Sequence, residues 1–392
     1  MKNKKIGFLL VGVLWLTACQ QQQPAGTPET ATLVVAFDTL QIIATAQAYL
    51  TQAPVPITTT SCPRSAGGPH DFYSEGDYWW PNPADPAGPY IRRDGQTNPE
   101  NFTAHRAAMR NLNQWVAALV AAYQVTGDEQ YARQAMAHLN AFFLDPATRM
   151  NPNLLYAQAI KGIVTGRGIG IIDTIHLIEV ARAIAQLAAQ GYLTGEPLAG
   201  LKQWFFDYAT WMNTHPYGLA EKDHGNNHST WWAAQMAAFA QLAGQEELLE
   251  VARQQFKKLL SAQMAPDGSF PEEISRTKPY SYTLFNLEGY AVLCEMATTP
   301  QENLWYYEGK NGSLERAWNF MVPFIKDKSK WIKPADVQHF EDLPIQSPGL
   351  LFAARAYNNP DFLALWQQLS PTRPSEEVNR TFPLREPVLW VK

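Results

Sequence analysis

The chain has 392 residues, of which 46% are hydrophobic and 17% charged, and its formal net charge is −5 at pH 7. This acidic balance, with no basic stripe in the sequence, argues against nucleic acid as a partner. A few cations gathered in a cleft can still dominate the local field, so an anionic polymer is not excluded. The net charge therefore limits the partners of the molecule as a whole but does not determine what its binding site can bind.

The first 38 residues are expected to precede the folded domain. Three lysines stand before an apolar run over residues 6–16, which is too short to span a bilayer and is typical of a secretory signal. The run ends in Leu-Thr-Ala-Cys and resembles a bacterial lipobox, which predicts cleavage before Cys19 and acylation of that cysteine. We expect a lipoprotein signal peptide over 1–18, a flexible tether over 19–38, and a lipid anchor in a bacterial membrane, the outer membrane facing the periplasm or the cell surface.

Residues 58–101 differ from the rest of the chain because they are dense in Gly, Pro and aromatic residues. Such a composition predicts a loop region rather than helices. Aromatic side chains in an irregular segment are costly unless they pack or bind. Trp79 and Trp80 are therefore expected either to stack on a sugar ring or to cover the helical core.

From residue 104 onward, apolar residues recur at helical spacing between short Gly, Pro or Asp breaks. The face through Met109, Leu112 and Val116 predicts one helix, and the face through Tyr131 and Leu139 predicts the next. Further helices are expected over residues 169–189, 201–213, 228–243, 246–264, 282–297, 313–325 and 347–357.

The 169–189 segment is apolar nearly all round, which predicts a buried inner helix. Antiparallel hairpins with inner helices wrapped by outer ones predict an all-α fold, an α/α toroid in the form of an incomplete barrel, with the aromatic-rich loop region at its N-terminal side. No linker interrupts the chain, so we expect a single domain over 39–392.

The most informative polar segment is 226–232, where Asn226, Asn227 and His228 precede a pair of tryptophans at an expected helix start. Asn is a favoured N-cap residue. The free N–H groups and the positive dipole end of a helix start favour an anion. The alternative interpretation is that the turn only caps the helix.

A second segment, 276–282, places Arg276 near two phenols, Tyr280 and Tyr282. Amide, imidazole, guanidinium and phenol together suit elimination from a uronic acid polymer, in which the C5 proton is removed and the C4 oxygen leaves. Donors that neutralise the carboxylate stabilise the charge that flows into it, and a base and an acid move the protons. Asn227, His228 and Arg276 are predicted as the donors.

Tyr282 is predicted as the proton-transfer group. A phenol has a pKa near ~10, which a neighbouring Arg lowers by favouring the phenolate. Tyr282 then serves as both base and acid on one side of the ring, while His228 is the alternative base for a substrate of the other C5 configuration. Tyr280 is the competing phenol.

These motifs resemble the alginate lyase superfamily of α/α-toroid polysaccharide lyases, most closely polysaccharide lyase family 38, which includes alginate and glucuronan lyases. The resemblance is carried by residues 76–83, 226–232 and 276–282, with further matching stretches at 150–158, 165–170 and 336–340. It implies cleavage of a 1,4-linked polyuronate, alginate or glucuronan, by β-elimination that leaves 4,5-unsaturated ends.

By this resemblance Asn227, His228 and Arg276 hold the carboxylate and Tyr282 is base and acid. The residues predicted to bind the polymer are Tyr280, Trp79, Trp80, Gln158, Arg167, Arg64, His70 and Trp232. No metal or other cofactor is predicted, since the chain has no C-x-x-C or H-E-x-x-H spacing. His176 and His339 are interpreted as core or rim residues, and Cys294 as a buried free thiol whose pairing with Cys62 the sequence leaves open.

Two rival functions stand beside the lyase. One is an inverting glycosidase that uses Asp223 or Glu75 with Glu272 or Glu273, although adjacent acids tend to point apart. The other is a surface lipoprotein that captures glycans without cleaving them. Only the lyase leaves a C4=C5 double bond that absorbs in the ultraviolet.

Overall fold

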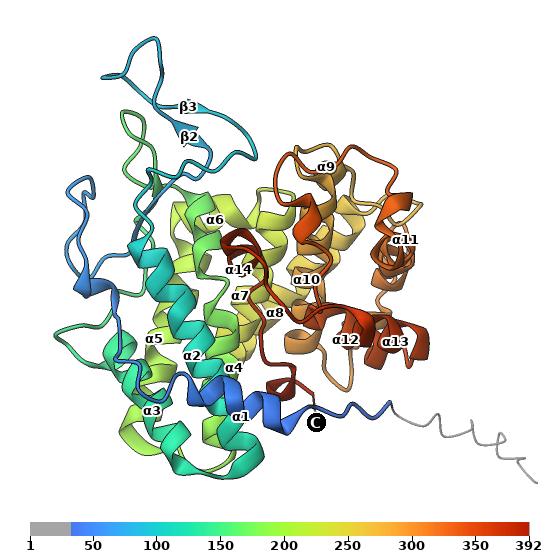
Figure 1. The fold of residues 1–392 in the computed structure, drawn as a ribbon, viewed down its shortest axis with the longest axis horizontal. Coiled ribbons are helices and arrows are strands. Elements are labelled where there is room, and N and C mark those ends of the chain that lie inside the picture. Colours follow the sequence, from blue (N-terminus) through green and yellow to red (C-terminus); the bar gives the residue numbers. More distant parts are fainter. Residues whose placement is uncertain (1–32, 392) are drawn as a thin grey trace, which may run out of the picture. The chain divides into compact units, whose positions relative to one another are not determined.

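The computed structural model describes residues 33–391, in which five inner helices follow one another side by side (Figure 1). Each inner helix packs against the next, in the order α2 (Ala104–Thr126), α4 (Leu177–Ala189), α7 (Asn227–Ala243), α10 (Pro279–Ala297) and α12 (Pro348–Ala356). The predicted signal peptide, Cys19 and the start of the tether lie outside the described residues.

Outer helices cover this inner layer. Those on α2 are α1 (Thr39–Gln47) and α3 (Glu129–Leu139), those on α7 are α5 (Gly195–Thr214) and α8 (Glu246–Gln263), and those on α12 are α11 (Leu314–Lys326) and α13 (Pro360–Gln368). The inner and outer layers form the predicted α/α toroid. Within residues 33–391 no helix is long and apolar enough to cross a membrane.

The predicted helices agree with the structure, except in the 169–189 segment. Its first part is a 3₁₀ helix over Gly168–Thr174, and the α-helix starts only at Leu177. Two glycines explain the difference, because a Cβ at Gly168 would lie 2.6 Å from the Tyr217 carbonyl oxygen and one at Gly170 would lie 2.4 Å from the Ala157 Cβ. The chain passes too close to its neighbours for a full α-helical turn with side chains.

The loop region over 58–101 contains three short strands that its composition did not indicate. β1 (Tyr73–Glu75) pairs in parallel with β4 (Tyr156–Ala159), and β2 (Trp79–Trp80) pairs antiparallel with β3 (Ile91–Arg92). These pairings hold the aromatic segment against the helical layers and fix the direction of Tyr78 and Trp79.

The start of α7 follows from its sequence. Asn226 is the N-cap, and its side-chain oxygen accepts a hydrogen bond from the backbone N–H of His228 at 3.1 Å, as expected for this residue type. The helix ends at Gly244, which adopts the left-handed φ of 71° that favours glycine. Because the cap fixes the first turn, Asn227 and His228 have defined directions.

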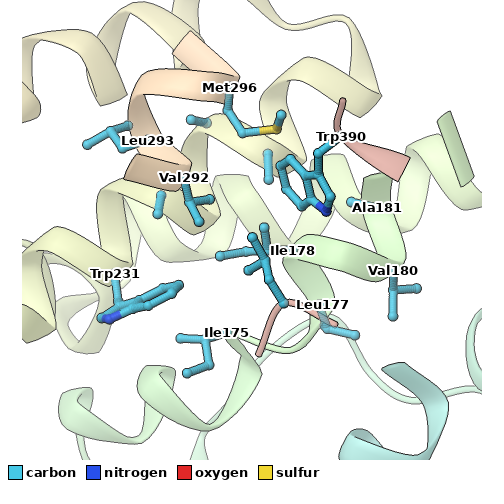
Figure 2. Close-up of a cluster of buried hydrophobic side chains, with 14 of the residues drawn as sticks. Ile175, Leu177, Ile178, Val180, Ala181, Trp231, Val292, Leu293, Met296 and Trp390 are labelled. Carbon is cyan, nitrogen blue, oxygen red and sulfur yellow. The ribbon is translucent and has the colours of Figure 1, made fainter. Parts of the chain in front are cut away.

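The C-terminal segment, residues 371–391, bridges the inner helices α2, α4 and α12. The carboxylate of Glu179 on α4 accepts hydrogen bonds from the backbone N–H groups of Arg385 and Glu386 and from the Trp390 indole. Figure 2 shows Trp390 packed near Met296 of α10 and the first turns of α4. The segment carries the short helix α14 (Glu376–Thr381), which the sequence did not indicate.

Candidate active site

The four residues predicted to carry catalysis line one cavity of about 300 Å³. Asn227 and His228 belong to the first turn of α7, Tyr282 belongs to the first turn of α10, and Arg276 lies in the loop between α9 (Pro271–Ile274) and α10. They converge because α7 and α10 are neighbours in the inner layer. The cavity therefore brings together the amide, imidazole, guanidinium and phenol.

Two buried carboxylates position the α7 pair. Glu273 accepts from the backbone N–H of Asn227 at 2.7 Å and from its side-chain Nδ2 at 2.5 Å, which leaves the second amide hydrogen for a ligand. Glu221 lies 2.7 Å from Nδ1 of His228. A carboxylate at Nδ1 places a proton there and leaves Nε2 as the free ring nitrogen.

The phenol of Tyr282 lies within a second polar cluster. Its hydroxyl is 2.9 Å from the hydroxyl of Tyr78 and 3.5 Å from Nη2 of Arg276, whose guanidinium carbon is 4.6 Å from the Tyr282 ring centre. Arg276 also donates to both carboxylate oxygens of Asp94, at 3.1 and 3.3 Å. Arg276 is thus already ion-paired in the unliganded protein.

The protonation of Tyr282 differs from the expectation that its neighbouring arginine would lower the phenol pKa. Burial raises the pKa of Tyr282 well above 10, and the hydroxyl of Tyr78 adds to this effect. The charge of Arg276 acts in the opposite direction but does not outweigh burial. The unliganded site therefore holds Tyr282 as a neutral phenol at neutral pH.

Charges of alternating sign form a continuous chain along the cavity. The chain begins at the buried Lys278, whose ammonium lies 2.8 Å from Glu377, and Glu377 accepts from Arg380 at 2.7 Å. Arg380 lies 2.6 Å from Asp77, which lies 2.5 Å from Arg106. We call this set the ion chain, and it ends where Arg106 contacts Asp173 at 3.0 Å.

Gln158 and Arg167 lie in the cavity wall, as predicted. Gln158 adopts an unusual φ of 49°, and Arg167 donates to its backbone oxygen and to Oε1, both at 3.0 Å. In the described part of the chain no carboxylate lies within ion-pair distance of Arg167, and burial lowers its pKa to about 10. Trp79 lines the same wall, with the guanidinium of Arg167 5.9 Å from its ring.

Two residues predicted to bind the polymer are instead buried in the core. Tyr280 is fully buried, donates to the Phe324 carbonyl oxygen at 3.2 Å, and is absent from the cavity wall. Trp232 is fully buried and donates to the Met212 carbonyl oxygen at 3.3 Å. Helical spacing places Tyr280 on another face of α10 than Tyr282, whereas Trp232 shares a face of α7 with His228 and is buried one turn further along the helix.

Three further predicted contacts lie outside the cavity wall. Arg64 forms a two-pronged ion pair with Glu75, at 2.6 and 2.7 Å. A ring nitrogen of His70 lies 2.7 Å from the Arg149 carbonyl oxygen. Trp80 sits in β2 and donates to the Gln96 carbonyl oxygen at 2.9 Å. The structure therefore does not bring these three residues together with the four predicted catalytic residues.

Sequence reasoning missed much of the cavity wall, which includes four arginines and a histidine: Arg92, Arg106, Arg110, Arg380 and His176. A signal existed for Arg106, since it precedes Met109 by three residues and so continues the predicted buried face of α2. No such signal existed for Arg380, because α14 is a six-residue helix in a Pro-rich stretch. His176, interpreted from the sequence as a core or rim residue, is 3% exposed and lines the cavity, and its Nδ1 has no hydrogen-bond partner in the described part of the chain.

The carboxylates required by the glycosidase alternative are not placed for it. Glu75 pairs with Arg64, Glu273 holds Asn227, and Asp223 pairs with Lys258 on the surface. None of these acids lines the cavity, and the acids that do are tied to arginines in the ion chain. Cys62 and Cys294 are both buried free thiols.

Comparisons with known proteins identify a family and a fold for this chain. The family model described as alginate lyase matches residues 57–331. A crystal structure of an alginate lyase from Bacteroides ovatus has a TM-score of 0.75 and 30% sequence identity, covering 88% of this chain and 92% of that one.

More distant structures share the fold. Alginate lyase A1-III from Sphingomonas species A1 has a TM-score of 0.54 at 14% identity, covering 90% of this chain and 94% of that one. A variant of alginate lyase A1-III in complex with a tetrasaccharide has a TM-score of 0.57 at 15% identity, covering 93% and 96%. None of the curated proteins compared with the chain matches it.

Replacing Glu377 by Gln tests the ion chain. Burial alone would raise the pKa of Glu377, but the charges of Arg380 and Lys278 outweigh it and hold the pKa at about 2, below the 4.5 of the free side chain. Its carboxylate thus stabilises the fold above pH 4.5, and this stabilisation is lost as the pH falls toward 2. We expect the variant to be less stable than the wild type near neutral pH, with the difference shrinking as the pH is lowered.

Chemical denaturation at a series of pH values measures this difference. The control is Glu376→Gln, an exposed acid on the same helix with a side chain 78% exposed. A stability difference for Glu377→Gln that stays constant down to about pH 2 would contradict the assignment.

Proposed function

This chain belongs to the alginate lyase family and is a polysaccharide lyase, and we propose that it cleaves alginate, a 1,4-linked polyuronate, by β-elimination in the cavity described above. The observation that carries the proposal is the convergence of Asn227, His228, Arg276 and Tyr282 on one cavity. Glucuronan, which differs in configuration only, is a second substrate that we propose on the same chemistry.

The charge of the wall supports an acidic polymer. Six arginines line the cavity, and only three carboxylates line it with them. Arg167 has no acid within ion-pair distance in the described part of the chain, so its guanidinium is available to a carboxylate of the substrate. We propose that Arg167 and Gln158 bind the polymer and that Trp79 contacts a sugar ring.

The first task of the site is to neutralise the carboxylate beside C5. We propose that the free amide hydrogen of Asn227 and the guanidinium of Arg276 donate to it. As the C5–H bond breaks, negative charge flows into this carboxylate, so donors that are already positioned stabilise the transition state more than the ground state. Glu273 and Asp94 hold the two donors in place before substrate arrives.

The second task is proton transfer. The C5–H electrons form the C4=C5 double bond, the C4–O bond breaks, and the departing oxygen takes a proton. Because burial keeps Tyr282 neutral, we propose that its phenol gives this proton to the leaving oxygen. The Tyr78 hydroxyl at 2.9 Å then returns a proton to Tyr282 or shares the one that remains.

The proton acceptor depends on the configuration at C5. Where the C5 hydrogen and the leaving oxygen lie on the same side of the ring, Tyr282 first passes its proton to Tyr78 as the Tyr78 hydroxyl releases its own proton to solvent. The Tyr282 phenolate then takes the C5 proton and gives it to the leaving oxygen. Where they lie on opposite sides, we propose that Nε2 of His228 is the base, oriented by Glu221. One cavity then accepts both kinds of uronate with different bases.

Replacing Tyr282 by Phe tests the reaction. We expect turnover of alginate to fall about 10²- to 10⁴-fold, the usual contribution of general acid–base catalysis, while binding of the polymer is retained. Ultraviolet absorbance of the unsaturated product measures turnover on alginate, its separated block types and glucuronan. The control is Tyr280→Phe, which removes a buried hydroxyl two residues away and should leave turnover nearly unchanged. Full activity of Tyr282→Phe would refute the assigned role.

Replacing Glu221 by Gln tests the second base. The amide cannot hold a proton on Nδ1 of His228 as the carboxylate does, so Nε2 becomes a poorer acceptor. We expect the rates on mannuronate-rich and guluronate-rich alginate to fall unequally, since only one of them uses His228. Initial rates on the two block types give the ratio, and equal losses on both would contradict a base that changes with configuration.

We also propose that the protein is lipid-anchored through Cys19, on the strength of the Leu-Thr-Ala-Cys motif after the apolar run. Replacing Cys19 by Ser in the full-length protein should move it from the membrane fraction to the soluble fraction of bacterial cells. Immunoblots of the two fractions measure this, and an unchanged distribution would contradict the anchor.

A further inference from the structure

Arg110 differs from the other arginines of the cavity in what surrounds it. It lies four residues after Arg106 on α2, so the two side chains share one helix face about 6 Å apart along the axis. Its side chain is 15% exposed. Its ion-pair partner, Glu376 at 3.2 Å, has a side chain that is 78% exposed.

The neighbouring arginines are satisfied by buried acids. Arg106 contacts Asp77 and Asp173, and Arg380 contacts Asp77 and Glu377; the side chains of these three acids are at most 10% exposed. A buried cation normally needs such a partner, because desolvation costs more than a solvent-screened contact returns. Arg110 is therefore a buried cation facing the cavity whose partner in the folded protein is only a surface carboxylate.

Two polar side chains line the cavity together with Arg110. His176 is 3% exposed, and its Nδ1 has no hydrogen-bond partner in the described part of the chain. Burial and the charge of Arg110 lower the pKa of His176 well below 6.5, so its ring is neutral. Thr381, at the end of α14, adds a hydroxyl. Guanidinium, imidazole and hydroxyl all donate to a carboxylate, and the guanidinium does so through two parallel bonds.

We propose that Arg110, with His176 and Thr381, forms a second carboxylate subsite, which holds a uronate residue of the polymer away from the bond that is cut. The inference rests on the proposed function, because it requires a polymer with one carboxylate on every sugar. Asn227 and Arg276 engage the carboxylate beside the reacting C5, so a neighbouring sugar brings a separate anion to Arg110. All three members come from segments outside 226–282, and Thr381 lies beyond the matched family region.

A length series of substrates tests the subsite. Rates on alginate oligosaccharides from disaccharide to hexasaccharide give kcat/KM for each length, and the wild type should gain at least tenfold at the length that first reaches Arg110. In Arg110→Gln we expect this gain to disappear, through a higher KM, while the shortest cleaved substrate keeps its kcat/KM. Thr381→Val should lose part of the same gain.

The matched control is Arg133→Gln, which removes the same charge from a surface ion pair on α3 with both side chains 63% exposed. Thermal unfolding checks that Arg110→Gln is folded, and no buried acid is left unpaired in that variant. Calorimetric binding of the tetrasaccharide and the hexasaccharide to Tyr282→Phe and to Tyr282→Phe/Arg110→Gln repeats the comparison without turnover.

The outcomes separate the two proposals. If the wild type cleaves no polyuronate, the proposed function fails. If it does cleave, and Arg110→Gln keeps the same gain with length, the subsite is refuted while the lyase assignment stands. A loss of kcat/KM that is equal for oligosaccharides of every length also refutes the subsite, since Arg110 then acts only through the general electrostatic field of the cavity.

Discussion

The ion chain from Lys278 to Asp173 is the constraint on which the cavity depends. Its members come from the loop before α10, from α14, from the aromatic loop region, from α2 and from the 3₁₀ helix before α4. Each inner member has an opposite charge on both sides, and removing Glu377 or Arg106 leaves an end of the ion chain, Lys278 or Asp173, as a buried charge without its ion-pair partner. The alternating charges therefore hold segments from the N-terminal and C-terminal parts of the protein together in one cavity wall.

This wall also explains why the catalytic groups are held ready. The ammonium of Lys278 lies 5.8 Å from the ring of Tyr78, and the hydroxyl of Tyr78 contacts that of Tyr282. The ion chain therefore supports the phenol pair through Tyr78. Glu221, on α6 (Pro216–Lys222), and Glu273, on α9, hold His228 and Asn227 in the same way. Reorganisation during the reaction is then small, which is the condition under which fixed donors stabilise a transition state best.

The sequence predicted those elements whose local residue pattern is sufficient to define them. Helical periodicity located most of the helices, and the N-cap residue Asn226 located the start of α7. It did not locate α14, because a six-residue helix carries no periodic signal, and its place is set by ion pairs with residues about 100 to 300 positions away. Tyr280 was misplaced because a step of two residues turns it to another helix face than Tyr282, and Trp232 because one helical turn beyond His228 already lies in the core.

The electrostatics of Tyr282 favour an order of events in the reaction. Arg276 is a nearby cation that stabilises a phenolate, and Asp94 already neutralises part of its charge. A substrate carboxylate bound to Arg276 adds a further negative charge beside the phenol and raises its pKa again. Tyr282 thus meets the substrate as an acid, and a base role requires that its proton leave first through Tyr78. His228 has no such requirement, because Glu221 leaves its Nε2 free before the substrate binds. A cavity with both groups can start the elimination from either face of the sugar while keeping a single proton donor for the leaving oxygen.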